Sequence, residues 1–116
     1  VAAGKGGKII NFSSQAGRRG EPRVAVYCAT KAAVISLTQS MAHELIKQRI
    51  NVNAIAPGVI DTPLHRKFRK DMAKRVALIP LKRMGRAEEV AEMAALLCGP
   101  GGSFITGQVL AVTGGE

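Results

Sequence analysis

Three short apolar runs with helical segments between them constrain the fold of this chain most strongly. The runs are KIINF at residues 8–12, INVNAIAP at residues 50–57 and GQVLAVTGG at residues 107–115. Runs rich in β-branched and apolar residues that are bounded by Gly or Pro are typical of buried strands. Helical patterns separate the runs, at residues 26–47 and 87–99. The alternation of strand and helix predicts a parallel α/β sheet.

The helical pattern at residues 26–47 has two apolar stripes. One stripe consists of large side chains at helical spacing, namely Val34, Leu37, Met41 and Leu45. The other consists of small side chains, namely Ala29, Ala32, Ala33 and Ser36. A helix with two apolar faces packs on a sheet and also on another helix or subunit, so we expect an oligomer interface here.

The remaining segments have weaker patterns. Residues 13–23, SSQAGRRGEPR, are predicted to be a loop because they contain two glycines, a proline and no apolar repeat. A second loop is predicted to begin after Gly58, and residues 66–78 favour a helix weakly. The helix at 87–99 is better marked, since Glu88 and Glu89 lie in its first turn and Gly99 lies at its end.

The composition suits one compact soluble domain, because 47% of the 116 residues are hydrophobic and 22% are charged. No apolar run approaches the roughly 18 residues that span a bilayer, and the N-terminal sequence lacks a signal-peptide layout. We therefore expect a cytoplasmic protein that does not enter a membrane. Cys28 and Cys98 are far apart and have no metal-binding spacing, so free thiols and no metal site are expected.

The net charge is +9, and nine of the cations lie between Arg66 and Arg86 with only Asp71 opposing them in that segment. Such a cluster is compatible with a nucleic acid, a membrane surface or an acidic protein, or with a solvated helix. Apart from Phe68, no aromatic side chain accompanies the charge as a stacking platform, and no zinc-finger or homeodomain spacing occurs. We favour the solvated helix and do not expect nucleic-acid binding.

A tyrosine and a lysine lie one helical turn apart at the start of the helix at 26–47. Tyr27 and Lys31 therefore project from one face, and a nearby cation can lower the pKa of a phenol. Such a tyrosine can donate and accept a proton near neutral pH. Ser14 follows the first predicted strand and Pro57 ends the second. Because the carboxyl ends of parallel strands share one rim of a sheet, we expect these residues to meet there.

Several short motifs occur in a fixed order. They are NFSS at 11–14, YCATK at 27–31, NVNAIAPGVIDT at 51–62, ITGQVL at 105–110 and GG at 114–115. Their order and spacing resemble those of the short-chain dehydrogenase/reductase family, and the resemblance covers essentially the whole chain. It implies an α/β fold, the C-terminal part of a Rossmann-type doubly wound parallel sheet with strands five to seven and their helices.

The resemblance also implies roles for the residues at this rim. Ser14 would position the reacting carbonyl, Tyr27 would be the general acid and base, and Lys31 would hold the nicotinamide ribose and lower the pKa of the tyrosine. NAD or NADP is the implied cofactor. Its contacts would come from Tyr27 and Lys31 and from the segment after the second strand, namely Pro57, Gly58, Val59, Ile60 and Thr62.

Simpler structural roles stay open for two of these residues. Ser14 could cap a turn, and Thr62 could cap a following helix. Asn53 is interpreted as a structural hydrogen-bonding residue. Expected substrate contacts are Ser14, Gln15 and Tyr27.

The family's N-terminal motifs do not occur in these residues. The glycine runs at 4–7 and 99–102 lack the preceding strand and following helix of a phosphate-binding loop. We therefore expect residues 1–116 to be the C-terminal catalytic half of a single domain, without its dinucleotide-binding half. The first strand would then have an unpaired edge, and a dimer or tetramer formed through the helix at 26–47 would stabilise the chain.

The predicted activity is hydride transfer between nicotinamide and a secondary alcohol or ketone. Substrate choice would be made by the residues from Gln15 to Arg23 and by the loop after Thr62. SSQAGRRGE at residues 13–21, together with VYCATKAAVISLTQS, most resembles bacterial dehydrogenases of sorbitol-type polyols, with Gln15 and Glu21 as hydroxyl partners. A 3-oxoacyl-acyl-carrier-protein reductase is the alternative enzyme, because its acidic carrier suits a basic surface. A truncated, non-catalytic interaction domain is the alternative from another class.

Overall fold

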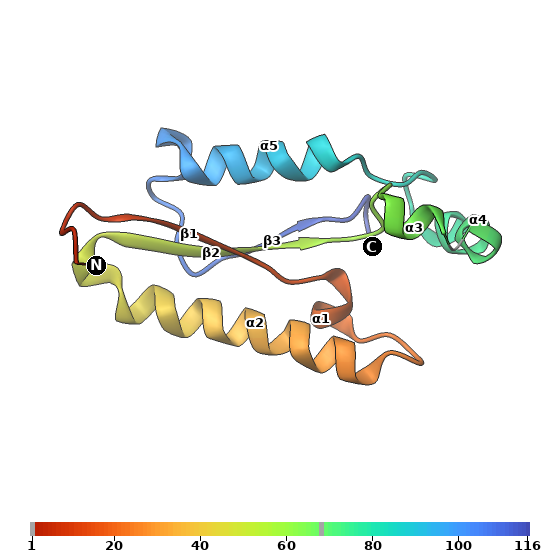
Figure 1. Cartoon of the computed structure of the whole chain (residues 1–116), viewed down its shortest axis with the longest axis horizontal. Coiled ribbons are helices and arrows are strands. Elements are labelled where there is room, and N and C mark those ends of the chain that lie inside the picture. Colours follow the sequence, from red (N-terminus) through yellow and green to blue (C-terminus); the bar gives the residue numbers. More distant parts are fainter. Residues whose placement is uncertain (1, 68) are drawn as a thin grey trace.

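The chain forms a three-stranded parallel sheet with helices on both faces (Figure 1). The computed structural model describes residues 2–67 and 69–116. Strands β1 (Gly7–Phe12), β2 (Ile50–Pro57) and β3 (Val109–Val112) lie in the order β1-β2-β3, and both pairings are parallel. The prediction of a parallel α/β sheet from the alternating pattern is confirmed.

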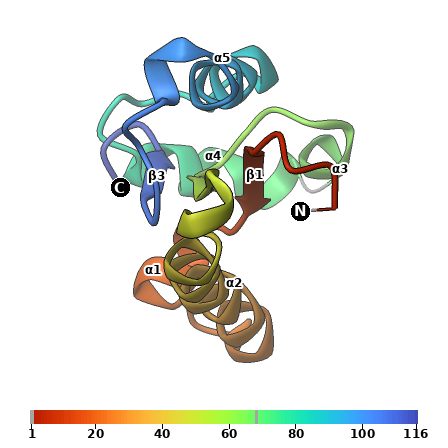
Figure 2. The same cartoon turned by 90° about the vertical axis from the view of Figure 1, so that its left-hand side faces the viewer.

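Five α-helices accompany the strands in the described part of the chain. They are α1 (Gln15–Arg19), α2 (Ala25–Glu44), α3 (Pro63–Arg66), α4 (Arg69–Leu78) and α5 (Ala87–Cys98), with short 3-10 turns at Ile46–Gln48 and Pro100–Gly102. Helices α1 and α2 lie on one face of the sheet and α5 lies on the other, as both views show (Figures 1 and 2). Helices α3 and α4 follow the carboxyl end of β2, so the loops that can form a site lie at that end (Figure 1).

The predicted strands differ from the observed ones mainly at their ends. Strand β2 has the predicted bounds, and β1 begins one residue earlier than predicted. Strand β3 is shorter than the predicted run at 107–115. Gly107, Gly114 and Gly115 adopt positive φ angles of 69°, 70° and 102°, which turn the chain out of the extended conformation on both sides of β3.

The prediction of a continuous loop at residues 13–23 was wrong, because α1 lies within it. Ser14 caps this five-residue helix by accepting a hydrogen bond from the backbone N–H of Ala16 at 3.2 Å. The helix is too short to show an apolar repeat. The loop predicted after Gly58 likewise contains α3, which Thr62 caps. Helix α4 occupies most of the weakly helical segment, and Phe68 lies outside the described residues.

Strand β2 is the centre of the core. Val52, Ala54, Ile55 and Ala56 have no exposed surface, which is expected for the middle strand of a sheet covered on both faces. Asn53 is also buried, and its side chain accepts from Gln108 N at 3.0 Å and donates to Ile105 O at 2.9 Å. Asn53 therefore ties β2 to the segment before β3, in agreement with its structural interpretation.

The face of α2 that packs on the sheet contains Thr38 and Ala42, which are buried, and the half-buried Met41 and Leu45 of the large-residue stripe. Leu37 of the same stripe is 54% exposed. Thr38 is accommodated because its hydroxyl donates to Val34 O at 2.7 Å and accepts from Asn11 Nδ2 at 3.0 Å. The small-residue stripe is exposed in this chain, and its pairing with another subunit stays a prediction.

No helix among residues 2–67 and 69–116 is both long enough and apolar enough to cross a lipid bilayer.

Gly17 allows α1 to pack directly on α2. A Cβ atom at this position would lie 2.6 Å from the Lys31 carbonyl carbon and 2.8 Å from Lys31 Cβ. Both atoms belong to a helix and cannot move aside easily. We predict that Gly17→Ala lowers the free energy of unfolding by about 1–3 kcal/mol, measured by urea denaturation.

Gly7→Ala is the matched control for this substitution. No atom lies within 4 Å of the position of a Cβ at Gly7, so the control is expected to change stability by less than about 0.5 kcal/mol. Equal effects of the two variants would contradict the role given to the Gly17 contact.

Glu89 links the start of α5 to the preceding loop. Its carboxylate accepts two hydrogen bonds from the Arg83 guanidinium, at 2.7 and 2.9 Å, and one from the backbone N–H of Arg86 at 2.7 Å. The Arg83 hydrogen bonds, followed by that of Arg86 N, lower the pKa of Glu89 from its ordinary 4.5 to about 2. A carboxylate with a lowered folded-state pKa stabilises the fold above its unfolded value, and this contribution is lost as the pH falls toward the folded value.

We predict that Glu89→Gln reduces the loss of stability between about pH 5 and about pH 3. Urea denaturation midpoints at the two pH values measure this difference. Glu88→Gln, at a neighbouring position without an ion pair in the described part of the chain, is expected to keep the wild-type pH dependence. A wild-type dependence in Glu89→Gln would contradict the assignment.

Candidate active site

The ends of β1 and β2 form an open pocket of about 330 Å³. Its lining contains the hydroxyl residues Ser13, Ser14 and Thr62 together with Pro57 and Gly58. Ile60, His65 and two apolar residues of α5, Ala87 and Val90, complete it. The structure therefore brings five of the predicted cofactor and catalytic residues to one pocket at the expected rim of the sheet, namely Ser14, Pro57, Gly58, Ile60 and Thr62.

Ser14 has a structural role and still presents a donor. Its Oγ accepts from Ala16 N as the cap of α1, which leaves the hydroxyl hydrogen available to another acceptor. The capping alternative considered for Ser14 is thus what the structure shows. Because Ser14 also lines the pocket, both roles are compatible with one geometry.

Lys31 is tied to the end of β1 by two hydrogen bonds. Its Nζ donates to Phe12 O at 3.1 Å, and its own carbonyl accepts from Ser13 Oγ at 2.8 Å. The ammonium lies 5.9 Å from the centroid of the Tyr27 ring, so the two side chains share one face of α2 as predicted. Tyr27 is 48% exposed, and no residue among 2–67 and 69–116 hydrogen-bonds its phenol oxygen. Neither residue lines the Ser14 pocket directly.

The segment after β2 is held by backbone contacts. Gly58 donates to Val112 O at 2.9 Å, and a Cβ at Gly58 would lie 2.9 Å from Thr113 Cα. Glycine at position 58 therefore permits the close approach of β2 to the end of β3. Val59 O accepts from Gly85 N at 2.9 Å, and Gly85 O accepts from Asp61 N at 2.8 Å. These bonds fix the backbone at Val59 and Ile60, whose side chains are buried.

Thr62 caps α3, and His65 contacts the same segment. Thr62 Oγ1 lies 3.4 Å from both the backbone N and Nδ1 of His65, while His65 Nδ1 lies 2.6 Å from Ile60 O. The helix-capping alternative for Thr62 is therefore also observed. His65 was not singled out in the sequence. The only indication in the sequence that His65 could lie at the site was its position three residues after Thr62, a weak indication.

A second, smaller pocket of about 140 Å³ adjoins the first, since Ser14, Pro57, Gly58 and His65 line both. Gln15, Glu21 and Arg75 supply further polar side chains to it. The amide oxygen of Gln15 accepts from Arg18 Nη1 at 3.0 Å, which orients this buried side chain. Gln15 and Ser14, both predicted substrate contacts, thus lie together.

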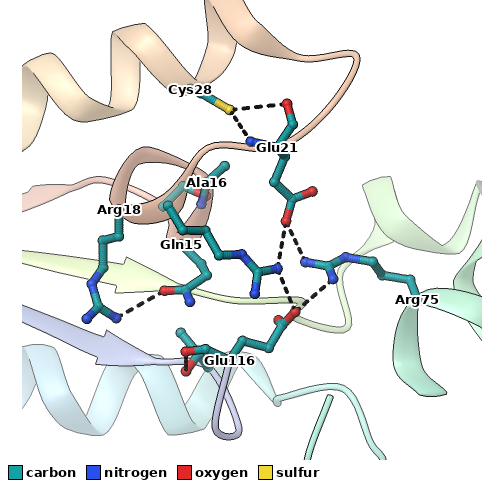
Figure 3. A network of polar contacts seen from close by, with 10 residues as sticks. Gln15, Ala16, Arg18, Glu21, Cys28, Arg75 and Glu116 are labelled. Atoms are coloured by element: carbon teal, nitrogen blue, oxygen red, sulfur yellow. Dashed lines mark hydrogen bonds and ion pairs between the residues drawn. The ribbon is translucent and has the colours of Figure 1, made fainter. Parts of the chain in front are cut away.

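Four charged residues form a cluster beside the smaller pocket (Figure 3). Glu21 accepts from Arg19 at 3.0 Å and from Arg75 at 2.7 Å, and Glu116 Oε1 lies 3.0 and 2.7 Å from the same two guanidinium groups. The side chain of Glu116 is 1% exposed, and its Oε2 has no hydrogen-bond partner in the described part of the chain. The hydrogen bond to Glu21 is the largest cause that raises the pKa of Arg19; burial opposes it and Glu116 adds to it.

This charge cluster connects three parts of the chain. Arg75 comes from α4, Glu21 from the loop after α1, and Glu116 from the residues after β3. Cys28, in the first turn of α2, accepts a hydrogen bond from Glu21 N at 3.1 Å (Figure 3). The position of α4 over the smaller pocket is therefore coupled to the start of the helix that carries Tyr27.

Several cations of the basic segment have carboxylate partners. Besides Arg75, Arg66 pairs with Asp61 at 2.9 Å, and Arg83 pairs with Glu89 at 2.7 Å. The sequence suggested a cluster opposed by little negative charge because these partner carboxylates lie outside the segment from Arg66 to Arg86. No group of three or more His, Cys, Asp or Glu residues among those described is placed to hold a metal ion.

The sequence is similar to those of known oxidoreductases. The family model described as enoyl-(acyl carrier protein) reductase matches residues 2–116. The chain is 52% identical to a sorbitol dehydrogenase from Cereibacter sphaeroides, covering all of this chain and 50% of that protein. It is 43% identical to a 3-oxoacyl-[acyl-carrier-protein] reductase from Thermotoga maritima, covering 96% of this chain and 46% of that protein.

A solved structure has the same fold. It is a putative 2-deoxy-D-gluconate 3-dehydrogenase from Agrobacterium tumefaciens with bound NADP, which superimposes with a TM-score of 0.91 at 37% identity and covers 97% of this chain and 47% of that one. The chain thus spans about half the length of the curated relatives it matches. Its sheet is part of a Rossmann-type doubly wound sheet, as the fold prediction stated.

We predict that Arg75→Met lowers the free energy of unfolding by about 1–3 kcal/mol, because it removes a charged partner from the buried Glu116 carboxylate. Urea denaturation measures the loss. Arg66→Met removes a more exposed ion pair, in which the side chains are 60% and 41% exposed, and is expected to lower stability less than Arg75→Met does. A larger loss for Arg66→Met than for Arg75→Met would contradict the importance given to burial.

Proposed function

The chain belongs to the short-chain dehydrogenase/reductase family, and on this premise we propose that it is the C-terminal catalytic half of an NAD(P)-dependent oxidoreductase. The complete enzyme would interconvert a secondary alcohol and a ketone. A dinucleotide-binding half would precede residue 1, in agreement with the half-length coverage of the relatives. The observation that carries the proposal is that Ser14 and the Pro57–Thr62 segment meet at the carboxyl ends of β1 and β2, where Lys31 of the Tyr27–Lys31 face donates a hydrogen bond to the Phe12 carbonyl.

Tyr27 would be the general acid and base. Its phenol is accessible, and Lys31 lies on the same face of α2, with its ammonium 5.9 Å from the centroid of the Tyr27 ring. Ser14 would donate a hydrogen bond to the reacting oxygen, because its own acceptor role is already fulfilled by Ala16 N. Ser13 Oγ donates a hydrogen bond to the Lys31 carbonyl, and this contact would keep the neighbouring Ser14 in a fixed position relative to Tyr27 and Lys31.

The larger pocket fits the nicotinamide end of a dinucleotide. Apolar surface from Ile60, Ala87 and Val90 suits a flat ring, and the Thr62 hydroxyl with neighbouring backbone groups suits a carboxamide. When bound, NAD or NADP would supply the hydride or accept it. Lys31 would hydrogen-bond the ribose hydroxyls, because the Phe12 carbonyl occupies only one of the three N–H donors of its ammonium group.

A polyol is the proposed substrate. The support is the 52% identity to a sorbitol dehydrogenase and the polar lining of the smaller pocket by Gln15, Glu21 and Arg75. A 3-oxoacyl-acyl-carrier-protein reductase is the second candidate, supported by the 43% identity to such an enzyme. The pairing of Arg66, Arg75 and Arg83 with carboxylates weakens the case for these arginines as a docking surface for an acidic carrier.

We also propose a cytoplasmic homo-oligomer, formed as a dimer or tetramer through the exposed face of α2. Val26, Leu37 and Ile46, in and just after this helix, are 79%, 54% and 53% exposed, and contact with a second subunit would bury them. The rival proposal of a non-catalytic interaction domain uses the same surface. Only turnover that depends on Tyr27 distinguishes an enzyme from such a domain.

Tyr27→Phe tests the proposed function. In the complete enzyme, with the dinucleotide-binding half present, the variant is expected to lose at least about 100-fold in kcat for sorbitol oxidation, because the general acid and base is removed. NADH binding, followed by nicotinamide fluorescence, and circular dichroism are expected to stay close to wild type. Turnover retained by Tyr27→Phe would contradict the proposal.

A further inference from the structure

We propose that His65 determines substrate specificity by accepting a hydrogen bond from a second hydroxyl group of the substrate. The substrate class that this favours is hydroxy ketones and polyols, in preference to ketones with only methylene groups beside the reacting carbon. The inference rests on the proposed function, and it assigns a residue of the same site that the family motifs do not include.

The hydrogen bonding of His65 defines which ring nitrogen is available. Nδ1 lies 2.6 Å from the carbonyl oxygen of Ile60, which can only accept, so Nδ1 carries the proton. In the neutral imidazole Nε2 is then a hydrogen-bond acceptor. No residue among 2–67 and 69–116 pairs with Nε2. The ring therefore has one nitrogen held by the protein and one that can bind a ligand.

The position of His65 is set by short-range contacts. Thr62 caps α3, Pro63 occupies the first turn, and His65 lies in the same turn. Because the backbone at Ile60 is fixed next to Gly85, the carbonyl that orients the imidazole is itself fixed. The imidazole is half-buried and has a defined orientation before a substrate arrives, which reduces the entropy lost on binding.

His65 and Ser14 line both pockets of the candidate active site. Ser14 can donate its hydroxyl hydrogen, and His65 can accept at Nε2, so the shared wall contains one donor and one acceptor. A carbonyl oxygen satisfies Ser14, and a hydroxyl group close to the reacting carbon satisfies His65. The walls contributed by Gln15, Glu21 and Arg75 extend this polar environment for further hydroxyl groups.

The same arrangement disfavours a 3-oxoacyl chain. A methylene group cannot donate a hydrogen bond to His65 Nε2. When it displaces water from this nitrogen, Nε2 is left without a hydrogen-bond partner, which costs binding free energy. His65 thereby provides a physical reason to prefer the polyol over the acyl-carrier alternative.

The test compares 1-hydroxybutan-2-one with butan-2-one as substrates of the complete enzyme. The wild type is expected to show a kcat/KM ratio in favour of the hydroxy ketone, and His65→Asn is expected to reduce that ratio about tenfold. Asparagine can still donate to the Ile60 carbonyl but has no group at the position of Nε2. His65→Gln, whose amide oxygen can reach toward that position, is expected to recover part of the ratio.

His43 provides a matched control because it is the only other histidine in the sequence. It lies near the end of α2, where it lines a different cavity with Gln39 and Ile46. His43→Asn is expected to leave the substrate ratio at its wild-type value. An unchanged ratio in His65→Asn, or an equal decrease in His43→Asn, would overturn the inference.

A second measurement does not depend on turnover. In the complete enzyme carrying Tyr27→Phe with bound NADH, ¹⁵N NMR of His65 is expected to show a shift of the Nε2 resonance with 1-hydroxybutan-2-one. Butan-2-one is expected to leave this resonance in place. A shift with both ketones, or with neither, would overturn the inference.

The two proposals fail in different ways. Turnover that survives Tyr27→Phe contradicts the proposed function. Loss of turnover in Tyr27→Phe with an unaltered substrate ratio in His65→Asn leaves the function in place and contradicts only the role of His65. A weaker affinity for NADH in His65→Asn without a change in the ratio would assign His65 to the nicotinamide pocket and would also overturn the inference.

Discussion

The two hydrogen bonds between the end of β1 and the second turn of α2 are the interactions on which the candidate site depends. Ser13 Oγ donates to the Lys31 carbonyl, and Lys31 Nζ donates to the Phe12 carbonyl. Gly17 allows α1 to pack against the backbone of α2 at Lys31, because no side chain at position 17 lies between the two helices. These contacts fix Ser14 relative to the Tyr27–Lys31 face. None of them uses the hydroxyl group of Ser14 or of Tyr27, the two hydroxyls of the proposed chemistry.

Much of this arrangement could be predicted from the sequence. The parallel sheet follows from the alternation of apolar runs and helices, and the bounds of β2 follow from a run that Pro57 ends. The meeting of Ser14, Gly58 and Thr62 at one rim follows from the topology of parallel strands. These predictions depend on patterns that extend over several residues, which tertiary contacts seldom override.

Other features were beyond local patterns. Helix α1 has five residues, so no repeat could indicate it, and its stability comes from the Ser14 cap and from contact with α2. The outward position of Leu37 arises because Thr38 satisfies its hydroxyl within the helix and with Asn11, which lets a polar residue occupy the sheet-facing side. The partners of Arg75 are 54 and 41 residues away in the sequence, and only the folded chain brings them together.

The proposed specificity would arise where the fold places polar groups that already have one hydrogen-bond partner within the protein. Ser14 Oγ accepts from a helix N–H and keeps a donor, whereas His65 donates to the Ile60 carbonyl in the loop after β2 and keeps an acceptor. The hydrogen bond that each side chain makes within the protein thus decides whether a donor or an acceptor remains for a substrate. Substrates with a carbonyl beside a hydroxyl match both remaining functions, and a simple ketone matches one. The helix cap formed by Ser14 is thus compatible with a role in catalysis. Together with the His65 hydrogen bond to Ile60, it sets the hydrogen-bonding polarity of the pocket.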